Sequence, residues 1–71
     1  MTAREDFPQR LRKLLERKQI SRKVLGELCG LSKNTIWRYE QGKRIPSIEN
    51  ARKLADFFDI SLDALIGKDR E

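Results

Sequence analysis

Residues 21–42 read SRKVLGELCGLSKNTIWRYEQG. In this stretch, Ser21 and Ser32 each precede a short run with helical apolar spacing, and serine is a preferred residue at the start of a helix. Gly30 follows the first run, and glycine often takes the left-handed conformation that ends a helix. The stretch therefore predicts two short helices, over residues 22–29 and 33–41, joined by a tight turn.

The sequence on both sides of this pair predicts three more helices. Residues 7–18 carry an apolar stripe with Asp6 as the cap, and residues 48–58 follow the cap Ser47. A last short helix, capped by Ser61, includes residues 62–66 and stops at Gly67. The prediction is an all-α fold of five helices in one domain of residues 1–67, followed by a charged tail over residues 68–71.

The helical spacing also predicts which apolar side chains are buried. On the helices that flank the tight turn and on the fourth helix, these are Val24, Leu25, Leu28, Ile36, Ile48, Ala51, Leu54, Ala55 and Phe58. Cys29 is expected to be a buried structural thiol. The apolar stripes of the fourth and fifth helices are wider than one small core requires, so four more apolar residues are expected to be partly exposed: Ile45, Phe57, Leu62 and Ile66. They are interpreted either as core or, as we favour, as a homodimer interface.

The helix over residues 33–41 has one face with no acidic side chain. At about 100° per residue, and with Ile36 set inward, Asn34, Arg38 and Gln41 point outward. The outward, edge and N-terminal positions carry only hydrogen-bond donors: Lys33, Asn34, Thr35, Trp37, Arg38 and Gln41. Arginine and lysine can pair with guanine O6 and N7, and asparagine with adenine N6 and N7. The face is therefore predicted to enter the major groove of double-stranded DNA.

Two short helices joined in this way form a helix-turn-helix, in which the second helix meets base edges and the first crosses the phosphate backbone. The predicted base-contacting residues are Lys33, Asn34, Arg38 and Trp37. The predicted backbone-contacting residues are Arg22, Lys23, Thr35, Gln41, Lys43 and Arg44. Trp37 has two interpretations that stay open, which are a contact with a sugar, phosphate or thymine methyl group and a lid on the protein surface.

The distribution of charge favours a polyanionic partner. The chain has a formal net charge of +5, but residues 10–44 hold 11 basic and 3 acidic side chains, a net charge of +8. Nucleic acid and an anionic membrane surface both fit such a charge. A membrane role is disfavoured because the core needs the apolar stripe of residues 7–18.

Several classes of protein are disfavoured by what the sequence lacks. There is no histidine and a single cysteine, so we expect no metal, no other cofactor and no internal disulfide. No nucleophile–base pair or glycine-rich phosphate loop is present, so we do not expect the protein to be an enzyme. No small-molecule ligand is evident either. The first residues are charged and have no apolar run behind them, so we expect a cytoplasmic protein.

A set of marks from residue 20 onward resembles the phage Cro and repressor-type family, also called the xenobiotic-response-element family. The marks are Leu25, Gly30, Ser32, Ile36, the run Tyr39-Glu40-Gln41-Gly42, Pro46-Ser47, Leu54-Ala55 and residues 60–66. The resemblance implies a lambda-repressor-like fold, a transcriptional regulator that acts as a repressor, and dimeric binding to a near-palindromic operator. It also implies base contacts from Lys33, Asn34 and Arg38. An antitoxin or another protein-interaction module on the same fold stays open.

Two positions depart from the family pattern. Gly26 stands where the family usually has alanine, and because glycine is worse than alanine in a helix by about 1 kcal/mol, Gly26→Ala is expected to raise stability. Leu15 stands where many members have an arginine that pairs with the glutamate at position 40. We therefore expect Glu40 to pair with another basic side chain, for example Arg12 or Lys43, or to accept hydrogen bonds from backbone donors.

Overall fold

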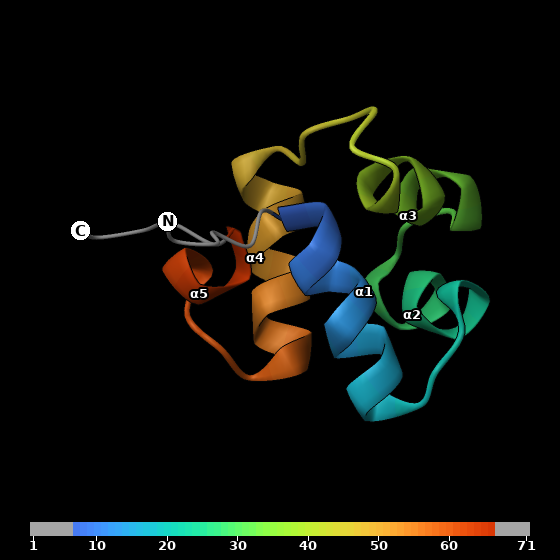
Figure 1. The fold of residues 1–71 in the computed structure, drawn as a ribbon, viewed down its shortest axis with the longest axis horizontal. Helices are drawn as coiled ribbons and strands as arrows, with labels where there is room; N and C mark the ends of the chain where they lie inside the picture. The colour runs from blue at the N-terminus through green and yellow to red at the C-terminus, as the bar shows by residue number, and fades with distance from the viewer. Residues whose placement is uncertain (1–6, 67–71) are drawn as a thin grey trace, which may run out of the picture.

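The computed structural model describes residues 7–66, which form five helices and no strand (Figure 1). The helices are α1 (Phe7–Lys18), α2 (Arg22–Cys29), α3 (Lys33–Glu40), α4 (Ile48–Phe58) and α5 (Leu62–Ile66). The all-α prediction is confirmed, although α3 ends one residue earlier than expected. Asp6, Gly67 and residues 68–71 lie outside the described residues. Within the described part, no helix has the length and apolar content needed to cross a membrane.

Serine residues start each of the four helices that follow α1. Their hydroxyl oxygens accept a hydrogen bond from the main-chain amide three residues later, at 3.0–3.1 Å. These residues are Ser21, Ser32, Ser47 and Ser61. Gly30 follows α2 with φ +74°, and its amide donates to the carbonyl of Gly26. The tight turn between α2 and α3 therefore forms as the sequence predicts.

Each helix contributes one large aliphatic side chain that is fully buried. These side chains are Leu11, Leu25, Ile36, Leu54 and Leu65, in chain order. Around them, α1 lies between the α2–α3 pair and the α4–α5 pair (Figure 1). The core therefore joins all five helices.

The rotation of α3 is fixed by a second buried side chain, Tyr39. Its ring packs edge-on against the ring of Phe7 with centroids 5.7 Å apart. Its hydroxyl oxygen accepts a hydrogen bond from Asn50 Nδ2 at 3.0 Å. Because Phe7 belongs to α1 and Asn50 to α4, Tyr39 holds the inner face of α3 against two other helices.

Three side chains predicted to be buried are exposed. Val24 and Leu28 lie on the outer side of α2, with 63% of Leu28 exposed, because this short helix packs through Leu25 and Gly26. Ile48 is exposed because it lies in the first turn of α4, at the edge of an apolar stripe that has Leu54 at its centre. The predicted partial exposure of the wider set is confirmed, since Ile45 and Ile66 are exposed and Phe57 and Leu62 are half-buried.

The structure contradicts the expectation that an alanine would fit at position 26. A Cβ built on Gly26 would overlap the main-chain carbonyl oxygen of Leu31 and would lie 3.4 Å from its carbonyl carbon. The turn folds back at this point, because the amide of Leu31 donates to the carbonyl of Gly26 at 2.8 Å. The close approach involves backbone rather than a flexible side chain, so Gly26 is required by the turn.

Candidate nucleic-acid interface

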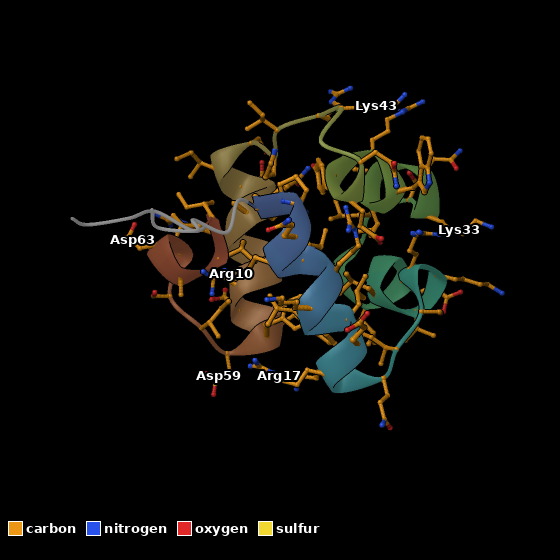
Figure 2. The ribbon with its side chains drawn as sticks, in the orientation of Figure 1. Arg10, Arg17, Lys33, Lys43, Asp59 and Asp63 are labelled. Carbon is orange, nitrogen blue, oxygen red and sulfur yellow. The ribbon has the colours of Figure 1, made fainter. Side chains whose placement is uncertain are left out.

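The outward face of α3 carries the side chains that were predicted to lie there. Asn34 and Arg38 are exposed, whereas Ile36 and Tyr39 are buried on the opposite face. Lys33, the first residue of α3, is exposed, and Gln41 follows the last turn and is exposed as well. Figure 2 shows Lys33 and Lys43 on the α3 side of the molecule and Asp59 and Asp63 on the other side, next to α5. Lys33 and Lys43 therefore lie away from Asp59 and Asp63, whereas Arg10 and Arg17 lie closer to these acidic side chains.

The ten predicted contact residues lie at the start of α2, on α3 and in the loop that follows it. Eight of them are exposed: Lys23, Lys33, Asn34, Trp37, Arg38, Gln41, Lys43 and Arg44. The other two, Arg22 and Thr35, are half-buried. The Thr35 hydroxyl lies 2.8 Å from the Ser32 hydroxyl, so it is already part of the cap of α3.

Trp37 is held by the loop after α3. The Lys43 ammonium nitrogen lies 5.7 Å from the centre of the Trp37 ring, which is a cation–π distance. The amide of Lys43 donates to the carbonyl of Arg38 at 2.9 Å and keeps the loop close to the helix. Trp37 is therefore a partly exposed ring beside the outward face of α3 with a basic side chain on it, and both interpretations of its role stay open.

The partner of the Glu40 carboxylate is Arg22. Arg22 Nε donates to Glu40 Oε2 at 2.8 Å, and Arg22 Nη2 donates to Glu40 Oε1 at 3.2 Å. Arg12 Nη2 donates instead to the main-chain carbonyl of Glu40 at 3.2 Å. The prediction that another basic side chain pairs with the carboxylate is therefore confirmed, but the two residues named for it, Arg12 and Lys43, were wrong.

The Arg22–Glu40 pair joins the first residue of α2 to the last residue of α3. The hydrogen bond to Glu40 raises the pKa of Arg22 above its ordinary value, so the guanidinium stays charged. One feature of the sequence pointed to such a pair, which is the apolar Leu15 at the position of the usual partner. That signal shows that a partner is needed but not which of the nearby basic residues supplies it.

Residues 11–65 match the family model described as Helix-turn-helix. The chain belongs to the Cro/C1-type helix-turn-helix family. The resemblance to the Cro and repressor-type family is thus confirmed, and so is the lambda-repressor-like fold. In this helix-turn-helix, α2 is the first helix of the motif and α3 is the second.

Known proteins similar to this helix-turn-helix chain include regulators. The HTH-type transcriptional regulator AnsR of Bacillus subtilis (strain 168) is 39% identical over 62 residues, which are 87% of this chain and 53% of AnsR. The chain therefore spans about half the length of that relative.

Two solved structures show the same helix-turn-helix fold. The restriction-modification controller protein C.AhdI from Aeromonas hydrophila is 39% identical with a TM-score of 0.78, over 83% of this chain and 89% of that one. The P22 c2 repressor, solved in complex with a synthetic operator, is 26% identical with a TM-score of 0.85, over 92% and 98% of the two chains.

An apolar groove lies beside the helix-turn-helix motif. It has a volume of about 550 Å³ and is formed by the start of α1, the loop after α3, α4 and α5. Its exposed apolar side chains are Ile45, Ile48 and Ile66, and 88% of Ile45 is open to solvent. Arg44 also lines the groove, so this apolar surface adjoins the basic loop.

Proposed function

We propose that this chain is a sequence-specific, double-stranded DNA-binding transcriptional regulator, and that it acts as a repressor in the cytoplasm. The observation that carries the proposal is the outward face of α3, which presents exposed hydrogen-bond donors and no acidic side chain while Ile36 and Tyr39 anchor the opposite face in the core. The major groove, about 12 Å wide, admits a helix.

The contacts follow from the chemistry of the exposed side chains. Arg38 can form a bidentate pair with guanine, Asn34 can pair with adenine, and Lys33 can reach guanine at the start of α3. Trp37 lies beside these positions and is included with the base-contacting residues. The backbone-contacting residues are Arg22, Lys23, Thr35, Gln41, Lys43 and Arg44. A phosphate bound at the start of α2 would also be favoured by the positive end of the helix dipole.

We further propose that the regulator binds a near-palindromic operator as a homodimer. A single α3 reads few bases, and pairing two copies joins half-sites about 34 Å apart. The apolar groove supports this proposal, because Ile45, Ile48 and Ile66 are large apolar side chains left open to solvent on one side of a small domain.

The test is selection of bound duplexes from a random pool. We expect one enriched motif with two related halves, and we expect Arg38→Ala to weaken binding to it by about 1–3 kcal/mol. The matched control is Arg52→Ala, which removes an exposed arginine from α4, outside the motif. If selected and random duplexes never differ in affinity by more than about tenfold, the protein is not a sequence-specific regulator.

A further inference from the structure

The Arg22–Glu40 pair is placed where neither charge stabilises its own helix. Glu40 is the only buried charged side chain among residues 7–66, with 4% of its surface exposed, and it stands at the last position of α3. Arg22 stands at the first position of α2. A helix dipole disfavours a carboxylate at the C-terminal end and a guanidinium at the N-terminal end. The pair therefore stabilises the contact between α2 and α3, and it does not stabilise either helix by itself.

The pair leaves one edge of the Arg22 guanidinium available. A guanidinium has five N–H donors, and Glu40 takes one from Nε and one from Nη2. The two Nη atoms keep an outer edge, whose geometry fits two oxygens of a phosphate. The Arg22 side chain is 42% exposed, so solvent and ligands can reach it.

We propose that Glu40 is a positioning residue for DNA binding and that it acts through Arg22. Its carboxylate orients the guanidinium so that the free Nη edge meets a backbone phosphate of duplex DNA at the start of α2. Arg12 holds the main chain of Glu40 from α1, so the end of α3, the start of α2 and the body of the domain are fixed to one another at this point. The inference rests on the proposed DNA-binding function and deepens it.

The direction in which Glu40→Gln changes the affinity for DNA distinguishes a positioning role from a simple effect of charge. Glu40 is an anion, so charge alone predicts that Glu40→Gln tightens binding to DNA by removing repulsion. Positioning predicts the opposite, because a neutral amide in the same place cannot hold the guanidinium through two charge-assisted hydrogen bonds.

The experiment measures fluorescence anisotropy of a short random-sequence duplex with the full chain. We expect Glu40→Gln to weaken binding about tenfold. The matched control is Glu49→Gln, which removes an exposed carboxylate from the first turn of α4 and causes the same change in net charge. Glu49→Gln is expected to bind as tightly as the wild type or slightly more tightly.

A double-mutant cycle distinguishes an effect of Glu40 through Arg22 from a general loss of structure. In an Arg22→Gln background, Glu40→Gln is expected to cause no further loss of affinity, because there is no guanidinium left to orient. Unfolding in urea gives the folded fraction of each variant, and affinities are compared per folded molecule. A Glu40→Gln variant that binds as Glu49→Gln does, or an equal loss with and without Arg22, overturns the inference. A wild-type protein that binds no duplex at any salt concentration overturns the proposed function as well.

Discussion

Replacing Gly26 with alanine is expected to destabilise the protein, although alanine is the better helix former. In α2 the substitution would gain about 1 kcal/mol of helix propensity. The added Cβ would overlap the carbonyl oxygen of Leu31, which belongs to the backbone of the tight turn. Inserting a methyl group into packed structure typically costs about 1–3 kcal/mol.

The cost is expected at the upper end of that range, because the turn has little freedom to open. The carbonyl of Gly26 accepts hydrogen bonds from the amides of both Gly30 and Leu31, the second at 2.8 Å, so moving Leu31 away lengthens that bond. When the gain in helix propensity is subtracted from the cost of the close contact, the free energy of unfolding is expected to fall by about 1–2 kcal/mol. For a domain of this size, it corresponds to a fall in Tm of roughly 5–15 °C.

Thermal and urea unfolding, followed by circular dichroism, measure this change. The control is Glu27→Ala, which places alanine at the next position of α2, where the side chain is exposed, and is expected to change stability by less than about 0.5 kcal/mol. An unchanged or higher Tm for Gly26→Ala would refute the reasoning, since it would mean that the turn accommodates a methyl group at little cost.

Three further predictions concern the DNA-binding side, the groove and the thiol. The slope of log affinity against log salt is negative, and Lys23→Gln should make it less negative by about 0.9, as loss of one phosphate contact does, whereas Arg52→Gln should leave the slope unchanged. If the groove is the proposed homodimer interface, the wild type should sediment as a dimer and Ile45→Asp as a monomer, whereas Leu28→Asp, at an exposed position outside the groove, should still sediment as a dimer. Burial raises the pKa of the Cys29 thiol, an effect that the charge of Lys53 only partly opposes, so less thiolate forms at a given pH. Iodoacetamide should therefore modify Cys29 more slowly at pH near 8.5, the ordinary thiol pKa, in the folded protein than in urea; equal rates would contradict this.

The local signals in the sequence were sufficient to predict the helices and the turn. A serine cap acts on an amide three residues away, and Gly30 takes its left-handed conformation within the turn itself. Because both effects depend on near neighbours in the chain, they can be interpreted without knowing the tertiary structure. The outward direction of Asn34 and Arg38 followed in the same way, from the position of Ile36 on the helix.

Features that depend on how helices meet could not be predicted from one helix at a time. Helical spacing gives the centre of an apolar stripe but not how much of it a neighbour covers, so Leu28 and Ile48 were assigned to the core although both are exposed. The partner of Glu40 is 18 residues away in sequence, on another helix. The space at Gly26 depends on the path of the turn rather than on the propensity of α2.

The core and the proposed DNA contacts are linked through the rotation of α3. Ile36 fixes its inner face, Tyr39 ties that face to α1 and α4, and Glu40 ties its last turn to α2 and α1. These three residues determine which way the rest of the helix points. Asn34 and Arg38 lie on the opposite face and contribute nothing to the core, so substitutions there can alter base preference at little cost in stability. Substitutions at the three anchoring positions would instead turn or release the whole face, and affinity for every DNA sequence would fall together.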